Sequence, residues 1–454
     1  MATISQGFAK FICGLSYDAL PGEVKEKAKT LLLHNIGVGL AAYDTETAQV
    51  AIGVAKKLGA GNATILVEGS RVNPLAAALA NGAIIHSRAQ EDNYKRGSVH
   101  LGVIVLPAAL AVGEEVAASG KEIITALVAG YEVGSRISRD YCRISTKRGF
   151  RSSTLYGPSG AAASAAKLFH LNAEQTASAL GWGVNLSGGL LQTAIDKTSE
   201  MAYQAGLAAR NGITAAMMGQ AGAIVAEGIY EGQCGLYRAF VESGLDLGPV
   251  LNGLGSEYVM LDTLLKPYPV GGGVQTATSV MLDLTLEHNI DPDGIEEVTA
   301  WLYPPEAAYP GASVAKPGLV SGIYCCAVAG VFRKLTLETI DQSEDPRVLS
   351  LMQKIKVVPD DSLQSMSARL QIKMKDGRAF RKDALLTFKD YCYSFEKDAQ
   401  LIRSLIPEMG LPADRVERVI EKIYRLESCG DIRDLIKMLV FPGKKATKFH
   451  RLLC

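Results

Sequence analysis

The chain has 454 residues, and its 47 lysines and arginines balance its 47 aspartates and glutamates, so it carries no net formal charge. A chain of this length can form two or three domains with a substantial core. The balanced charge excludes a bulk electrostatic attraction to nucleic acid or to an anionic membrane, so any charge on a substrate must be matched locally.

The eight cysteines form no CxxC pair, and no histidine lies at zinc-ligand spacing. This distribution indicates reduced thiols rather than a disulfide framework or a metal site. The first residues have neither the regions of a signal peptide nor the Arg-rich character of a transit peptide. Charges or Gly/Pro clusters interrupt every apolar run before it reaches membrane-spanning length. We therefore predict a soluble cytoplasmic protein.

Helices are predicted from the start of the chain to about residue 60. One of them opens at Pro21, and apolar residues then recur on one face from Val24 to Ile36. A short apolar run at residues 64–67 predicts a small strand.

From Pro74 the composition turns to Ala and Gly, which predicts compact helices whose small side chains let them pack tightly. A polar, charged loop with His86 at one end and His100 at the other separates the first two of these helices. Functional groups are often carried on such loops; the alternative is a solvated surface loop. The small-residue helices are predicted at residues 75–87, 101–120 and 122–138.

Three cations and three hydroxyls surround Gly149 between Lys147 and Thr154. Residues 157–166, which follow, are almost entirely Gly, Ala and Ser, so they predict a helix at the centre of a helical domain. The junction carries a cationic loop onto the first turn of this helix, whose free N–H groups and dipole favour an anion. The alternative is a solvated basic turn before an ordinary core helix.

The residue pattern changes at Lys266. A Lys-Pro-Tyr-Pro turn and three glycines cannot be helical there and mark a domain boundary or a site loop. Beyond it, alternating patterns predict strands, the last of which runs into the hairpin signal Asp376-Gly377. From Asp398 the pattern returns to helix. We predict a helical domain from residues 1–262 and 400–454, and an α+β domain from residues 263–399.

Eight segments together resemble the MmgE/PrpD family, which is named for 2-methylcitrate dehydratase and also includes cis-aconitate decarboxylase and iminodisuccinate epimerase. The resemblance runs over nearly the whole chain. It implies a mainly α fold with a large all-helical domain and a smaller α+β lid, a homodimer, and a site in the cleft between the domains. It implies no metal and no organic cofactor. The segments are residues 31–42, 78–87, 100–115, 128–137, 148–150 with 156–171, 205–218, 266–273 and 321–329.

The charged loop resembles the family's own loop in part. His86 and His100 match the histidines that open and close it. The family's first Asp falls on Ala89, and Glu91 and Asp92 stand where a later acidic pair is expected, although these two acids would also suit a capped or solvated loop.

Further along the chain, Lys266 matches the Lys of the family's Lys-Pro-Tyr-Pro turn, and Tyr324 matches the Tyr of its Ser-x-x-Tyr motif. Three positions depart from the family's pattern. Arg151 stands in the place of a His, and Met201 stands in the place of a Lys, with Lys197 four residues earlier. A His expected beyond the Lys266 turn is absent.

The family's common step moves a proton at a carbon next to a carboxylate, which needs a base and a positive charge. His100 is the candidate base, with Lys266 or Tyr324 on the opposite face. Arg151 in place of a His exchanges acid–base capacity for carboxylate binding, because an Arg almost never gives up a proton. The candidate substrate-binding residues are Arg151, Arg148, Lys197, His86, Asp92 and Met201.

The favoured hypothesis is an epimerase or isomerase that abstracts a proton next to a carboxylate of a small di- or tricarboxylate. One alternative is a dehydratase or decarboxylase with a rearranged acid–base set. Another is a non-catalytic carboxylate-binding protein, against which the retained His100, Lys266 and Tyr324 argue. We expect these three side chains and Arg151 to converge on one cleft, with Met201 at its edge.

Overall fold

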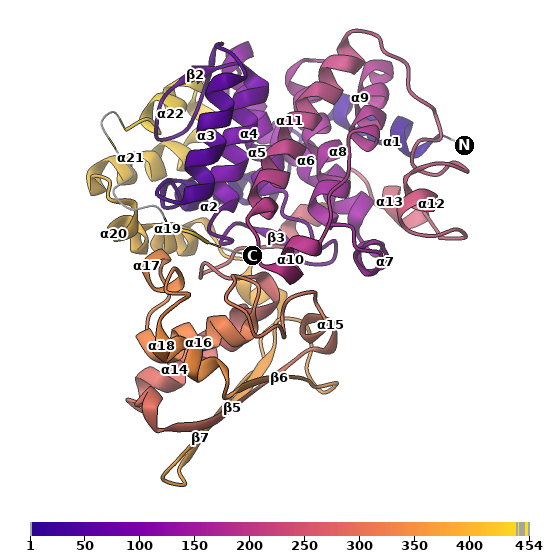
Figure 1. Ribbon diagram of the computed structural model, residues 1–454. Helices are drawn as coiled ribbons and strands as arrows, with labels where there is room; N and C mark the ends of the chain where they lie inside the picture. Colours follow the sequence, from indigo (N-terminus) through magenta and orange to yellow (C-terminus); the bar gives the residue numbers. More distant parts are fainter. Residues whose placement is uncertain (1, 442–443, 445–449, 453–454) are drawn as a thin grey trace.

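The structure is a computed structural model that describes residues 2–441, 444 and 450–452. Figure 1 shows a mainly helical part, coloured indigo to magenta with a yellow flank, joined to a smaller orange part that carries a sheet. The prediction of a mainly α fold with a smaller α+β domain is confirmed. No helix in the described part of the chain is both long and apolar enough to cross a membrane.

The helical part is built from two stretches of the chain, because its last helices return from the carboxyl-terminal side. Its helices are α1 (Ile4–Gly14), α2 (Gly22–Leu40), α3 (Glu46–Lys57), α4 (Pro74–His86), α5 (Gly102–Val116), α6 (Gly120–Ser138), α7 (Cys142–Lys147), α8 (Ser152–Leu168), α9 (Ala173–Asn185), α10 (Gln192–Asp196), α11 (Glu200–Gln220), α12 (Leu236–Phe240), α13 (Gly248–Leu251), α19 (Phe395–Ser404), α20 (Ile406–Met409), α21 (Ala413–Tyr424) and α22 (Arg433–Met438), with short 3-10 turns η1 (Val259–Asp262) and η5 (Leu426–Ser428).

Two short antiparallel ladders accompany these helices. One pairs β1 (Ala63–Thr64) with β2 (Arg71–Val72), where a small strand was predicted at residues 64–67. The other pairs β3 (Asn93–Tyr94), inside the charged loop, with β4 (Thr263–Leu264), just before Lys266. The second ladder fixes the relative position of two segments that are far apart in the sequence.

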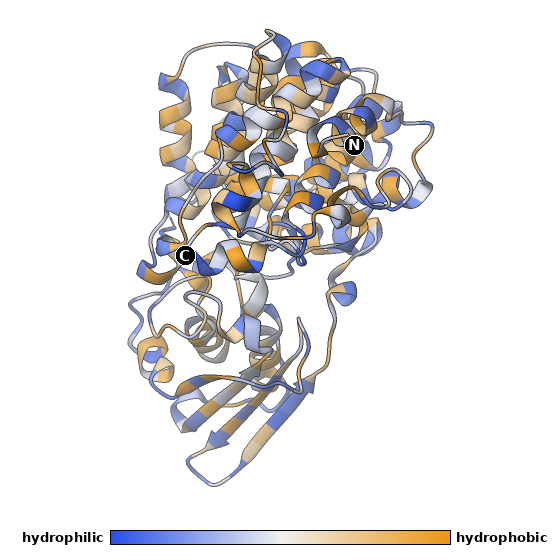
Figure 2. Cartoon of the chain, turned by 90° about the vertical axis from the view of Figure 1, so that its right-hand side faces the viewer, coloured by the Kyte–Doolittle hydropathy of each residue, from blue (hydrophilic) through white to orange (hydrophobic). Residues whose placement is uncertain are grey.

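The smaller part folds around a mixed four-stranded sheet in the order β6-β5-β7-β8. β5 runs parallel to β6 and antiparallel to β7, and β7 forms a hairpin with β8 through Asp376-Gly377, as predicted. Figure 2 shows hydrophilic and hydrophobic residues alternating along these strands. The elements are α14 (Gln275–Glu287), β5 (Ile295–Leu302), α15 (Pro304–Ala307), α16 (Gly322–Phe332), α17 (Leu337–Ile340), α18 (Pro346–Met352), β6 (Ile355–Pro359), β7 (Ala368–Met374) and β8 (Ala379–Ala384), with 3-10 turns η2 (Gly272–Val274), η3 (Pro292–Gly294) and η4 (Phe388–Tyr391).

The two largest hydrophobic clusters among the described residues follow this division. The larger core takes residues from Ile4 to Leu265 and again from Phe395 to Phe441, and the smaller core is built mainly from Val270 to Met374. The predicted domain bounds, 1–262 with 400–454 and 263–399, stay a prediction beside these core memberships.

Small residues bring the helices at the centre of the larger part into close contact. All of residues 157–166 in α8 are buried, as predicted. Where α11 crosses α4, Gly206 leaves no room for a side chain, because a Cβ there would lie 2.1 Å from the carbonyl oxygen of Leu79. Close backbone contact of this kind makes a rigid platform for the loop that follows α4.

We predict that Gly206→Ala lowers the free energy of unfolding by about 1–3 kcal/mol, because the added methyl overpacks the α4–α11 crossing. The matched control is Gly53→Ala on α3, where a Cβ would meet no atom within 4 Å. This substitution should stabilise the helix by about 0.5–1 kcal/mol. Urea denaturation of both variants measures the difference. Equal effects at the two positions would contradict the packing argument.

Candidate functional site

The β3–β4 ladder brings the charged loop against the Lys266 turn. Its register pairs Asn93 with Leu264, and continuing an antiparallel register by two residues places Glu91 opposite Lys266 on the same face. The charged loop, residues 87–101, connects α4 to α5, so both of its ends are anchored in the packed helices.

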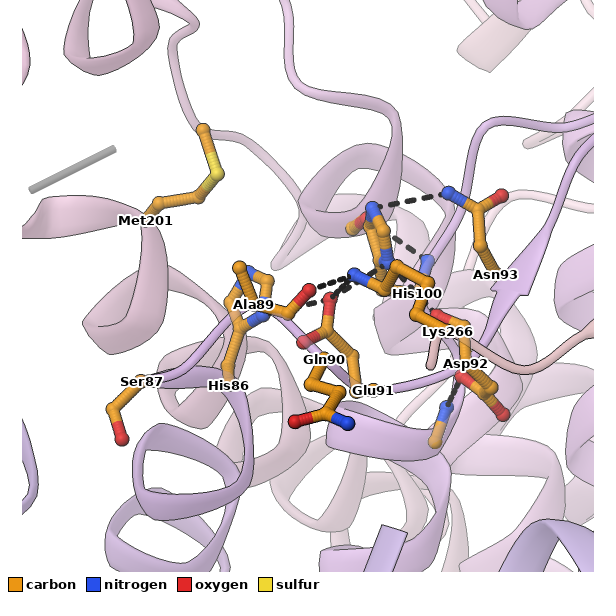
Figure 3. Close-up of polar contacts among 12 residues, drawn as sticks. His86, Ser87, Ala89, Gln90, Glu91, Asp92, Asn93, His100, Met201 and Lys266 are labelled. Atoms are coloured by element: carbon orange, nitrogen blue, oxygen red, sulfur yellow. Dashed lines mark hydrogen bonds and ion pairs between the residues drawn. The ribbon is translucent and has the colours of Figure 1, made fainter. Parts of the chain in front are cut away.

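Glu91 lies at the centre of the contacts made by this loop (Figure 3). Its carboxylate is buried, and Oε1 lies 2.8 Å from Lys266 Nζ, 2.9 Å from His100 Nδ1 and 3.1 Å from His86 Nδ1. Burial alone would raise the pKa of Glu91, but its contacts with His86, Lys266 and His100 outweigh burial and hold the pKa well below its usual range. Glu91 is therefore an ionised carboxylate inside the protein.

Lys266 is the nearest of these three partners of the carboxylate. Its side chain is 1% exposed, and Nζ donates to Glu91 Oε1 and to the carbonyl oxygen of Ala89. Burial lowers the pKa of Lys266, and Glu91 opposes that shift. Ala89 has a left-handed φ of 53°, a conformation that non-glycine residues seldom adopt. Backbone strain of this kind often marks a functional loop.

His86 connects Glu91 to Arg151. Arg151 Nη2 donates to His86 Nε2, so the histidine proton belongs on Nδ1, which faces Glu91. Burial, with a further contribution from Arg151, lowers the pKa of His86 to about 4, so His86 is neutral at physiological pH. Arg151 also donates to the backbone oxygen of Met201 and to Gln204 Oε1, the latter at 3.2 Å.

His100 is the most accessible side chain of the group. It is 18% exposed, whereas His86 is 4% exposed and Glu91 is fully buried. Its Nδ1 lies 2.8 Å from the backbone oxygen of Asp92 as well as 2.9 Å from Glu91 Oε1. Both partners are acceptors, so Nδ1 carries a proton and Nε2 remains for proton transfer.

Asn93 stands at that second nitrogen. Its Nδ2 lies 3.3 Å from His100 Nε2, while its Oδ1 has no hydrogen-bond partner among the described residues. Turning the amide by half a rotation would present the oxygen to a protonated Nε2, because the two amide atoms are nearly equivalent in shape. Asn93 can therefore serve His100 in either protonation state.

Asp92 connects the charged loop to the neighbouring helices. Its Oδ1 accepts the N–H of Gly102 at 3.0 Å at the start of α5, and its Oδ2 accepts from the Tyr131 hydroxyl and from Asn35 Nδ2. Burial raises the pKa of Asp92 despite these donors. Both carboxylate oxygens accept hydrogen bonds from protein groups, whereas we expected Asp92 to contact a substrate.

Four predicted residues lie apart from the Glu91 contacts. The Tyr324 hydroxyl donates to the carbonyl oxygen of Ile340 at 2.6 Å, inside the smaller core, and burial raises its pKa. Arg148 Nη1 donates to the carbonyl oxygen of Val241, and Lys197 Nζ donates to that of Gly311. The Met201 side chain is buried beside Leu191 and Ala194 and lies apart from the contacts in Figure 3.

Contacts through Glu91 and His86 link His100, Arg151 and Lys266, whereas the Tyr324 hydroxyl lies elsewhere. Their convergence on one cleft stays a prediction. The sequence analysis missed the central place of Glu91, whose only signal was its position in the loop. Within the described part of the chain, no group of three or more His, Cys, Asp and Glu side chains is arranged to hold a metal ion.

We predict that Glu91→Gln lowers the free energy of unfolding by about 3–5 kcal/mol at neutral pH, because it leaves the buried Lys266 ammonium without a counter-charge. The folded-state pKa of Glu91 is depressed, so its contribution is present above its unfolded pKa of about 4.3 and is lost as the pH falls below it. Denaturation at a series of pH values should show the difference from wild type shrinking in acid.

The control for this variant is Glu115→Gln at an exposed position of α5, which should change stability by less than about 0.5 kcal/mol. Equal stability of Glu91→Gln and wild type at neutral pH would show that Glu91 is not an ionised partner of Lys266.

Comparison with known proteins places this chain in a family. Residues 6–246 match the MmgE/PrpD N-terminal domain, and residues 268–389 match the MmgE/PrpD C-terminal domain. The chain is 23% identical to a cis-aconitate decarboxylase-like protein, oryM, of Aspergillus oryzae, with 96% of this chain and 97% of that protein covered. It is 24% identical to a cis-aconitate decarboxylase of Aspergillus terreus (95% and 94% covered) and 25% identical to the human cis-aconitate decarboxylase (98% and 96% covered). The chain belongs to the MmgE/PrpD family.

Proposed function

We propose that the chain is a cofactor-independent decarboxylase of a small di- or tricarboxylate, with His100 as the group that transfers the proton. The observation that carries the proposal is the arrangement of His100, whose Nδ1 is engaged by the Glu91 carboxylate at 2.9 Å, while Nε2 contacts the Asn93 amide at 3.3 Å, a contact that a substrate would have to replace. The cis-aconitate decarboxylases that the chain resembles favour the same class of reaction.

Decarboxylation asks for one proton donor. The bond between the departing carboxylate and its neighbouring carbon breaks, carbon dioxide leaves, and the electron pair remains as an enediolate of a second carboxylate. Positive charge from Arg151 and Lys266 stabilises this enediolate, and His100 Nε2 delivers a proton to the carbon. Glu91 orients the imidazole ring and balances the charge that it carries when Nε2 is protonated.

An epimerase or isomerase is the second candidate. It is favoured by two departures from the family's pattern, Arg151 in place of a His and Met201 in place of a Lys, which remove acid–base groups and leave a binding cation. Inversion at a carbon needs a second proton-transfer group on the opposite face, however. Of the two candidates, the Tyr324 hydroxyl is used by Ile340, and Lys266 Nζ is used by Glu91 and Ala89. This requirement ranks epimerisation behind decarboxylation.

The homodimer and the cytoplasmic location stay predictions. The molecular mass of the protein in solution at working concentration tests the first, and the location of the protein in fractionated cells tests the second.

We predict that incubation in heavy water with a panel of di- and tricarboxylates, cis-aconitate among them, releases carbon dioxide from one member and leaves deuterium at the protonated carbon of the product. Deuterium in recovered substrate or its epimer, without carbon dioxide, would favour the epimerase instead. No change in any acid would contradict both enzymes and support a carboxylate-binding protein.

On the acid that is turned over, His100→Asn should lower kcat by about 100-fold to 10,000-fold, because it removes the proton donor. His170→Asn, at a histidine whose side chain is 73% exposed, is the matched control and should keep wild-type turnover. Full activity of His100→Asn would remove His100 from the mechanism.

A further inference from the structure

A second pair of titratable side chains lies buried behind the charged loop. His34 of α2 and Asp398 of α19 are both fully buried, and His34 Nδ1 lies 2.7 Å from Asp398 Oδ1. The other ring nitrogen, His34 Nε2, lies 2.9 Å from the backbone oxygen of Gln90. The pair therefore touches the loop at the residue that precedes Glu91.

The protons of this pair can be assigned from its partners. The oxygen of Gln90 can only accept, so His34 Nε2 carries a proton. The contact with Asp398 needs one more proton, which sits either on Nδ1 or on the carboxyl group, and the pair has no net charge in either case. Among the charged groups that act on His34 or Asp398, Asp92 favours a charged His34 and Lys27 favours an ionised Asp398. The donor toward Gln90 is present in both forms.

The same loop is held at three of its carbonyl groups by basic side chains. Lys266 donates to the oxygen of Ala89, His34 to that of Gln90, and His100 lies 2.8 Å from that of Asp92. Of these three side chains, His34 alone makes no contact with the Glu91 carboxylate, so it acts on the backbone of the loop and not on the carboxylate itself. The Gln90 side chain adds a fourth hold, because Nε2 donates to the oxygen of Pro267 at 2.7 Å.

We propose that His34 and Asp398 are positioning residues that fix the peptide between Gln90 and Glu91, and so aim the Glu91 carboxylate at His100. The dyad also joins α19, the first helix after the sheet of the smaller part, to the site loop. Its effect on turnover rests on the proposed function, while its effect on the loop does not.

The test uses the double variant His34→Leu with Asp398→Leu. Replacing both members of a buried polar pair by apolar side chains of similar volume is often neutral for stability, so the protein should fold while the oxygen of Gln90 loses its donor. The matched control is Glu132→Leu with Arg136→Leu, which removes another fully buried ion pair, at 2.9 Å on α6, whose partners lie outside the charged loop.

We expect amide hydrogen exchange across residues 87–101 to rise about 10-fold or more in the His34/Asp398 double variant and to stay at the wild-type rate in the control. Turnover should fall by about 10-fold to 100-fold in kcat with little change in KM, because a misplaced Glu91 affects His100 more than it affects substrate binding. Asp398→Asn should restore most of the activity, since its amide can turn and donate to His34 Nδ1 while Nε2 keeps its proton.

The proposal would be overturned if amide hydrogen exchange across residues 87–101 in the double variant stayed at the wild-type rate. A fall in kcat no larger than in the control would overturn it as well. If the double variant does not fold, Asp398→Asn compared with Asp398→Leu gives the same decision through rescue of exchange and kcat. If the wild-type protein turns over no carboxylate, the proposed function is wrong, and the exchange measurement alone still decides whether the dyad positions the loop.

Discussion

One buried carboxylate organises the site. Glu91 has no access to solvent, so its charge persists only because Lys266, His100 and His86 surround one of its oxygens at 2.8–3.1 Å. The dependence is mutual, since without Glu91 the Lys266 ammonium would be an unpaired charge in the interior. The short β3–β4 ladder sets this geometry by aligning the charged loop with the Lys266 turn. The close-packed helices keep both ends of the charged loop in place.

The contacts of this carboxylate run in two directions, one through His86 and one through His100, which we call the two arms of the site. Toward His86 the arm ends in Arg151, a permanent cation, and burial, with a further contribution from Arg151, keeps the pKa of His86 low enough for a neutral ring, so this side can attract a carboxylate and transfers no proton. Toward His100 the arm ends in a partly exposed imidazole ring whose Nε2 contacts Asn93, so this side can transfer a proton. A substrate that lies across both arms would have its charge on the first and its reacting carbon at the second.

Much of the fold could be predicted from the sequence, because local sequence patterns determine its helices and turns. The small residues of 157–166 predicted a buried helix, and Asp376-Gly377 predicted the β7–β8 hairpin. His100 and Lys266 were found by their motifs. The place of Glu91 was not predicted, because it depends on the register of two short strands that lie far apart in the chain. Tyr324 was expected at the site from its motif, but its hydroxyl points into the smaller core, a direction that spacing cannot reveal.

Neutron diffraction from a deuterium-exchanged crystal tests the central claim most directly, because it locates the protons around Glu91. The account predicts three deuterons on Lys266 Nζ, one on Nδ1 of both His86 and His100, and none on either oxygen of Glu91. A deuteron on the Glu91 carboxyl group, or a neutral Lys266, would contradict a site organised by a buried negative charge.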